Sequence, residues 1–365
     1  RQQWALSVLE PLKVECNDRN FIKSFAWARL ISAQLIVEND HRKYLMNGIP
    51  FEPYPHGFYT CFSLPGLLNT GILAEDALLV LNDLVSFQNK NELSDSFGMI
   101  PGIISEDGAQ YKIPEIGGMV AVALKGLNLT QPLDSADHVR FGKILYNSLV
   151  GSAKYRLYNG LVHSKGDEYL LWDSPIAPDR QGATIESQVL FGKLQDYILR
   201  HPFSDAIDPE MPTSLLHGSG TFRQRLYKGD LVATGNAGGF IIPLTQKQLL
   251  GSFNKTIDRK FQRMDQIKFV GVQELDVEQE VKKSATSEIS RIIAMYLNDR
   301  GEQLPDVFAM EHLIEKELMG ASGFRSRSPQ DEHYDPEHLY LLEDSPSGTK
   351  TSGDILVWTS GMMAD

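Results

Sequence analysis

The feature that most constrains the fold is the alternation of helical segments with long loops. Apolar residues recur at the three- and four-residue spacing of amphipathic helices through most of the chain, whereas strand signals are few and short. We expect helices at residues 21–37, 74–87, 116–124, 138–149, 185–199, 246–258, 287–297 and 307–318. Gly126 and the His201-Pro202 pair are expected to end two of these helices.

Loops rich in Gly, Pro, Asp and Ser connect these helices. They cover residues 47–57, 98–115, 159–183, 201–240 and 323–354. Loops of this length are typical of a rigid scaffold that carries its function on the connections. The pattern predicts an all-α protein built as a two-layered ring of helices, with short extended pieces at 169–172, 239–242 and 268–272. Residues 1–365 are interpreted as one domain with a possible loop insertion at 201–236.

Composition excludes several classes of partner. The chain has 365 residues, of which 42% are hydrophobic, and its net charge is −12. An acidic chain lacks the excess of Lys and Arg that binds nucleic-acid phosphates or anionic lipid, so we expect neither nucleic-acid nor membrane partners. No apolar run is long enough to span a bilayer. Cys16 and Cys61 are too few and too unpatterned for a disulfide framework or a zinc site, which favours a reducing, cytoplasmic location.

The chain also lacks the common cofactor motifs. It has no phosphate-binding P-loop, no dinucleotide-binding glycine fingerprint, no zinc-protease helix motif and no nucleophile elbow. We therefore expect no cofactor and no metal.

Asp173 is the strongest candidate for a catalytic group. It follows Trp172 at the end of the apolar run Tyr169-Leu170-Leu171, and Ser174-Pro175 comes next. An indole can stack on a sugar and desolvate the adjacent carboxyl, and desolvation raises a carboxyl pKa toward the range that a general acid needs. The alternative is that Asp173 caps the turn that Ser174-Pro175 makes.

Other candidate residues lie in separate segments. Tyr54, His56 and Tyr59 belong to an aromatic, Pro-rich loop at 51–59, which suits stacking on sugar rings as well as ordinary loop packing. Glu186 lies in the first turn of a helix that Thr184 can cap, so a structural role is equally open to it. Two arginines in the 323–329 segment can bind an anion or pin a structural turn.

Several short motifs occur in the order found in one enzyme family. They are FAWAR at 25–29, GIPF at 48–51, SLPGLL at 63–68, MIPG at 99–102, YKIPE at 111–115, NGL at 159–161, LLWDS at 170–174, IESQV at 185–189 and GFRSRSP at 323–329. This order resembles the glucosidase domain of glycogen-debranching enzymes. SLPGLL is expected at a helix start, as in that family.

The resemblance implies a fold and an activity. Members of that family form an (α/α)6 toroid, are six-hairpin glycosidases and hydrolyse glycosides with inversion. Related trehalase-like and α-glucosidase families carry an acid in a setting similar to Trp172-Asp173-Ser174-Pro175. The resemblance implies that Asp173 is the general acid, that the substrate is a carbohydrate, and that Trp172, Tyr54, His56, Tyr59, Tyr111, Glu115 and Glu186 line one pocket at one end of the ring.

This chain also departs from the family. The Arg and Asp that would grip a terminal glucose are replaced in the segment 55–60, and the family's base carboxylate would come after the last residue of this chain. Arg29 and Arg180 are candidates to replace the lost cation. We expect a less polar pocket, with the less polar part of the ligand against Phe58 or Tyr59.

Alternatives from other classes remain. Glu343, Asp344 and Asp354 are candidate bases, and none is distinguished by its pattern. Without a base, the chain would be a non-catalytic glycan-binding or scaffold domain on the same fold. A sugar epimerase or isomerase that uses His56 or His163 as its base is a third hypothesis.

Overall fold

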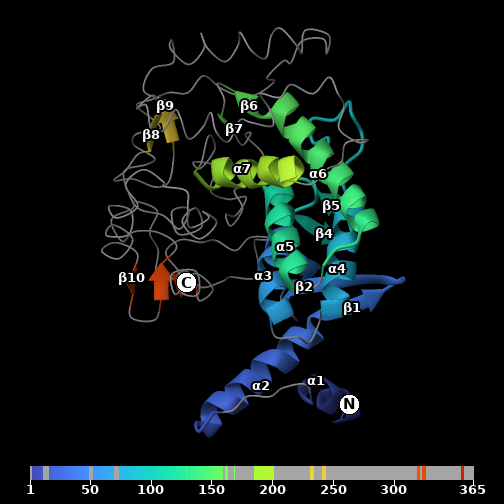
Figure 1. Cartoon of the computed structure of the whole chain (residues 1–365), viewed down its shortest axis with the longest axis vertical. Coiled ribbons are helices and arrows are strands. Elements are labelled where there is room, and N and C mark those ends of the chain that lie inside the picture. Colours follow the sequence, from blue (N-terminus) through green and yellow to red (C-terminus); the bar gives the residue numbers. More distant parts are fainter. Residues whose placement is uncertain are drawn as a thin grey trace.

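The structure is a computed structural model. It describes residues 2–10, 16–48, 52–69, 74–130, 132–158, 161–162, 168, 185–200, 231–233, 241–243, 319–320, 323–325 and 355–356. The helices are α1 (Gln2–Leu9), α2 (Arg19–Gln34), α3 (Gly57–Asn69), α4 (Ala74–Ser86), α5 (Ile116–Thr130), α6 (Ser135–Tyr155) and α7 (Ile185–Arg200). Figure 1 shows α3 to α7 gathered in one body, with α1 and α2 extending away from it.

The strands are short. They are β1 (Ile36–Asn39), β2 (Arg42–Gly48), β3 (Glu52–Pro55), β4 (Ile103–Ser105), β5 (Gly108–Gln110), β6 (Leu157–Tyr158), β7 (Leu161–Val162), β8 (Leu231–Ala233), β9 (Ile241–Pro243), β10 (Met319–Gly320), β11 (Gly323–Arg325) and β12 (Ile355–Leu356). All their pairings are antiparallel, and β1-β2-β3 and β10-β11-β12 form the two three-stranded sheets.

One apolar core joins α3, α4, α5, α6 and α7. Its members are buried Leu, Ile, Val and Phe side chains at helical spacing, so each helix turns one stripe inward. Fully buried representatives from the first four of these helices are Leu64, Leu81, Leu124 and Leu145. The periodicity that predicted α4, α5, α6 and α7 therefore reflects a real core, whereas α3 was not among the predicted helices.

Helices α3 and α5 lie side by side and run in the same direction. A Cβ on Gly57 at the start of α3 would lie 3.2 Å from Ile116 at the start of α5, and a Cβ on Gly126 would lie 3.1 Å from the ring of Pro65. We call this contact, made by Gly57, Pro65, Ile116 and Gly126, the apolar seam. Two predictions are wrong here. Gly126 does not end α5, because its missing side chain leaves room for Pro65 within the contact. The SLPGLL segment lies inside α3 rather than at its start.

Helix α7 crosses α5 near the end at which α5 begins (Figure 1). A Cβ on Gly118 would lie 2.5 Å from the carbonyl oxygen of Leu190, so only glycine permits this approach. The predicted bounds of α7 and of α4 are confirmed within one residue.

Other boundaries differ from those expected. Helix α2 ends at Gln34 because Ile36 and Val37 pair with Leu45 and Tyr44 in a β-hairpin. Helix α6 begins at Ser135, earlier than predicted, since the side chain of Asp134 accepts a hydrogen bond from the backbone N–H of Asp137.

The loops expected at 47–57 and 98–115 are partly extended, because β2 pairs with β3 and β4 with β5. The extended piece expected at 239–242 overlaps β9. The pieces expected at 169–172 and 268–272, and the helices expected at 246–258, 287–297 and 307–318, lie outside the described residues.

Candidate active site

The junction between β3 and α3 is fixed against the segment that follows α4. His56 forms an isolated antiparallel bridge with Ile103, and the backbone N–H of Gly57 donates to the carbonyl of Gly102 at 2.7 Å. A Cβ on Gly57 would lie 2.4 Å from the carbonyl oxygen of Pro101, so glycine is required at this close approach. The segments around His56 and Ile103 therefore share one backbone frame.

His56 is a neutral group in this frame. Its ring is half-buried, and its Nδ1 atom is shielded from solvent without a hydrogen-bond partner among the described residues. Its centroid lies 4.9 Å from that of Tyr59. Burial lowers the pKa of His56 to about 4, so the imidazole is uncharged at neutral pH. His56 therefore cannot supply the cation that this segment lacks.

The residues after His56 form the first turn of α3 rather than the predicted loop. Phe58 is completely buried in the core, so the expectation that Phe58 contacts a ligand is wrong. Tyr59 is partly exposed, and its ring contacts the rings of His56 and Phe58. Thr60 is buried, and its Oγ1 has no hydrogen-bond partner in the described part of the chain. Of the aromatic side chains Phe58 and Tyr59 in this turn, Tyr59 is thus the one with exposed surface.

Glu115 lies where two helices begin. Its carbonyl accepts a hydrogen bond from the backbone of Met119 in the first turn of α5. Its buried carboxylate accepts a hydrogen bond of 2.5 Å from the hydroxyl of Ser187, in the first turn of α7. Helix N-termini carry partial positive charge, which favours an anionic group at this position. The sequence indicated Glu115 and Glu186 as site residues but not Ser187. The expected start of a helix at residue 185 was the one feature that pointed to Ser187.

Tyr111 ties the same region to α4. Its hydroxyl donates a hydrogen bond of 2.5 Å to the carbonyl of Phe87, directly after α4, and burial raises the pKa of the phenol. The single hydroxyl proton of Tyr111 is therefore used to hold the segment after β5 against the end of α4.

These contacts gather several predicted residues at one end of the helical body. His56 and Tyr59 lie at the start of α3, Glu115 at the start of α5, and Tyr111 beside the end of α4. Tyr54 lies in the adjacent strand β3 and is half-buried. Glu186 is the second residue of α7, beside Ser187.

The remaining predicted residues are not described. Asp173, Trp172, the candidate bases Glu343, Asp344 and Asp354, and Arg180 all lie outside the described residues. Arg29 is buried on α2, where its Nε donates a hydrogen bond of 2.9 Å to the carbonyl of Val8 in α1. Arg29 is therefore engaged in the contact between α1 and α2.

The described residues also bear on metal-binding and membrane-spanning sites. Within those ranges no group of three or more His, Cys, Asp and Glu side chains is arranged to hold a metal ion. None of the helices described has the length and apolar character needed to cross a bilayer. Comparison with protein-family models and with curated proteins found no match to this chain.

Proposed function

We propose that this chain is an inverting glycoside hydrolase on an (α/α)6 toroid, with Asp173 as its general acid and a glycan or small glycoside as its substrate. The observation that carries the proposal is the gathering of His56, Tyr59, Tyr111 and Glu115 at one end of the helical body, because the motif order predicts a single pocket there.

The arrangement of the described helices supports the toroid. Helices α3 and α5 start at the same end, and α4 finishes at that end, where Phe87 meets Tyr111. Helix α6 also finishes there, since Ser148 accepts a hydrogen bond from Gln88, two residues after α4. Two successive helical hairpins therefore have the same orientation, as a ring of hairpins requires.

The chemistry proposed for this end is acid-assisted displacement by water. Asp173 would protonate the glycosidic oxygen while a water oxygen bonds to the anomeric carbon and the carbon–oxygen bond breaks. A second carboxylate roughly 6.5–9.5 Å away would take the proton of that water. In this proposal Glu115, whose carboxylate accepts a hydrogen bond from Ser187, would also accept one from a substrate hydroxyl.

Specificity in this proposal follows from what the α3 turn lacks. His56 is neutral, and the side chains of Phe58 and Thr60 are buried. No charged side chain of this turn is available to grip the hydroxyls of an unmodified terminal glucose. The preferred substrate is a substituted glycoside whose less polar part lies against Tyr59.

The test is a screen for released sugar with α-glucosides, trehalose and charged glycosides, followed by NMR of the product anomer. We expect inversion, and we expect Asp173→Asn to lower kcat by about 10²–10⁴-fold, the range that general acids contribute. Rapid release of glucose from a limit dextrin would contradict the proposed specificity.

A non-catalytic glycan-binding domain is the second candidate, favoured by the absence of a charged group at the α3 turn. Calorimetric binding of a sugar without turnover, unchanged in Asp173→Asn, would favour this candidate over hydrolysis.

A further inference from the structure

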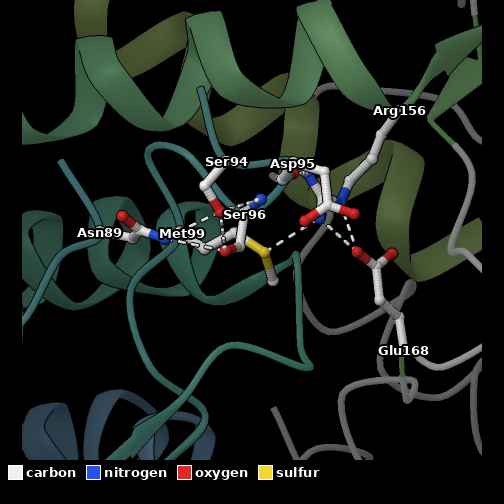
Figure 2. Close-up of polar contacts among 7 residues, drawn as sticks. All are labelled: Asn89, Ser94, Asp95, Ser96, Met99, Arg156 and Glu168. Atoms are coloured by element: carbon white, nitrogen blue, oxygen red, sulfur yellow. Dashed lines mark hydrogen bonds and ion pairs between the residues drawn. The ribbon is translucent and has the colours of Figure 1, made fainter. Parts of the chain in front are cut away.

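The loop of residues 88–100 is held at its base by backbone and side-chain hydrogen bonds. The backbone N–H of Asn89 donates to the carbonyl of Met99 at 2.9 Å, and that of Gly98 donates to the carbonyl of Asn89 at 2.8 Å. The amide of Asn89 also donates to the hydroxyls of Ser94 and Ser96, which lie 2.8 Å apart (Figure 2). The loop is therefore closed across its base.

The tip of this loop is fixed by its own turn and by α6. The side chain of Asn91 accepts a hydrogen bond of 3.1 Å from the backbone N–H of Leu93. The carbonyl of Glu92 accepts hydrogen bonds from the hydroxyl of Tyr155 at 2.9 Å and from the ammonium of Lys154 at 3.2 Å, both in the last turn of α6. The backbone next to Leu93 therefore has a defined conformation.

Leu93 projects from this fixed backbone and is 93% exposed, although it is apolar. A loop that is already ordered loses less conformational entropy when it binds, so a leucine held in this way is suited to anchor a contact. Glu92 and Asp95 beside it are exposed, and residues 91–95 contain no basic side chain. We call residues 91–95 the Leu93 tip. It combines one apolar side chain with negative charge.

Helix α2 exposes a group of apolar side chains. Phe21, Trp27 and Ile31 are 52%, 65% and 49% exposed, and Phe25 stacks on Phe21 with their ring centroids 6.2 Å apart. Arg29, by contrast, lies buried on the side that meets α1. Exposed apolar residues that cluster, rather than occurring singly, are typical of a surface that another molecule covers. We call Phe21, Phe25, Trp27 and Ile31 the α2 face.

Basic side chains continue this surface toward the start of α2. Four residues follow one another at four-residue steps, in one row along the helix: Arg19, Lys23, Trp27 and Ile31. Arg19 and Lys23 are exposed, and α2 contains no acidic residue. The row therefore places positive charge beside an apolar surface, whereas the Leu93 tip places negative charge beside an apolar side chain. The two surfaces are complementary in charge, and each offers apolar area to the other.

The Leu93 tip and the α2 face of one copy are far apart. Lys154 and Tyr155, which hold the tip, lie at the end of α6 that leads into β6. Figure 1 shows this end of α6 at the top of the view and α2 at the bottom, with α4 and α5 between them. The two surfaces can therefore meet only when they belong to different copies.

We propose that copies of this chain associate head to tail, with the Leu93 tip of one copy against the α2 face of the next. Leu93 packs against Trp27 and Ile31. The carboxylate of Glu92 pairs with the ammonium of Lys23. Because the two surfaces differ, a pair of copies still has one unused tip and one unused face, so the contact repeats into a ring or an open chain. This association goes beyond the proposed glycosidase function and holds whether or not the chain hydrolyses a glycoside.

Sedimentation velocity of the full chain over a range of concentrations tests the association. The wild-type sedimentation coefficient should rise with concentration. Leu93→Asp and Trp27→Asp should each weaken association by about 10-fold or more, because each removes an apolar side chain from the contact and adds a charge. A wild-type chain that stays monomeric up to about 1 mM would overturn the proposal. So would flotation of that monomer with vesicles of anionic phospholipid, which would assign the α2 face to a membrane.

Leu79→Asp is the matched control, since Leu79 is another exposed leucine, on α4, and belongs to neither surface. It should associate as the wild type does. Circular-dichroism melts of all three variants should stay close to the wild-type melt, because the substituted side chains are exposed. An equal loss of association in Leu79→Asp would overturn the role of the Leu93 tip.

Mixing the two blocked variants distinguishes head-to-tail association from other arrangements. Leu93→Asp retains its α2 face and Trp27→Asp retains its Leu93 tip, so an equimolar mixture can form one contact per pair and cannot extend it. We expect a 1:1 complex of the two variants. A mixture that sediments as monomers would overturn the proposal. Wild-type association in Leu93→Asp alone would also overturn it, because the α2 faces of two copies would then contact each other.

Charge reversal tests the pairing of Glu92 with Lys23. Glu92→Lys and Lys23→Glu should each weaken association by about 2–5-fold, the range of an exposed ion pair, and their combination in one chain should restore it. Glu106→Lys, at an exposed position between β4 and β5, changes the net charge as Glu92→Lys does and should leave association unchanged. Losses that add in the double variant would overturn this pairing.

Discussion

The polar seam is the contact that Gln88, Gly98, Ser148 and Arg156 make between the loop of residues 88–100 and α6. The apolar seam and the polar seam both bring backbones close together, but different chemistry holds them. In the apolar seam a proline ring of α3 meets a glycine of α5, and the surrounding side chains are aliphatic. In the polar seam the carbonyl of Gly98 accepts hydrogen bonds from two buried side chains, and Arg156 joins three partners. Apolar packing tolerates changes that keep size and shape, whereas each buried polar group depends on a particular partner. The two seams should therefore respond differently to substitution.

The largest effect is expected at Gly98. This residue has φ of +76°, and a Cβ would lie 2.0 Å from the carbonyl oxygen of Asn147. Gly98→Ala should lower the free energy of unfolding by about 2–5 kcal/mol, from roughly 1–2 for the left-handed backbone and about 1–3 for the clash. Urea denaturation measures this loss.

Gly108→Ala is the matched control for Gly98→Ala. Gly108 also has positive φ, of 114°, but nothing lies within 4 Å of its Cβ position. Its substitution should cost only the backbone part, about 1–2 kcal/mol. Equal losses of stability at the two positions would mean that the 88–100 loop can shift away from α6 to accommodate the added methyl group.

The second largest effect is a pH dependence of the free energy of unfolding, which we expect from His56, next to Gly57 in the apolar seam. The pKa of His56 is about 4 in the folded protein and about 6.5 in an unfolded chain. As the pH falls from 6.5 to 4, the unfolded chain takes up a proton that the folded protein does not. Stability is therefore complete above pH 6.5 and is lost through this window, by about 3 kcal/mol.

Urea denaturation at several pH values checks this dependence. His56→Gln should remove most of the loss between pH 6.5 and 4. His41→Asn, an exposed position in the β1–β2 turn, should retain the wild-type profile. If His56→Gln follows the wild-type curve, His56 is not the group that titrates.

A smaller loss is expected at Gln88. Gln88→Leu keeps an apolar stem of similar size but removes the amide that donates to Gly98 and Ile144. The loss should be about 2 kcal/mol, the cost of leaving buried polar groups without partners. Gln34→Leu, at an exposed position of α2, should cost almost nothing by the same thermal or urea measurement. If Gln88→Leu leaves the free energy of unfolding unchanged, the proposed difference between the two seams is wrong.

The smallest effect is expected at Gly126 in the apolar seam. Alanine gains about 1 kcal/mol of helix propensity over glycine, which offsets the tight contact with the Pro65 ring. Gly126→Ala should change the free energy of unfolding by less than about 1 kcal/mol. Gly118→Ala in the same helix should be clearly worse, because its Cβ would meet the backbone of Leu190 at 2.5 Å. Circular-dichroism melts compare the two variants.

The sequence alone determined the existence and extent of α4 and α7, because local apolar periodicity specifies a helix wherever one face meets a core. It also identified Tyr54, His56, Tyr59, Tyr111 and Glu115 as candidates for one region, since their motifs occur in a characteristic order.

Only the tertiary structure decided what these residues contact. The start of α3 depends on the frame shared with Ile103, and the continuation of α5 through Gly126 depends on Pro65. The partner of Glu115 is Ser187, 72 positions away along the chain. Periodicity reports which face of a segment is buried. It does not report which distant segment covers that face, because the pairing depends on the shapes and hydrogen-bonding groups of both partners.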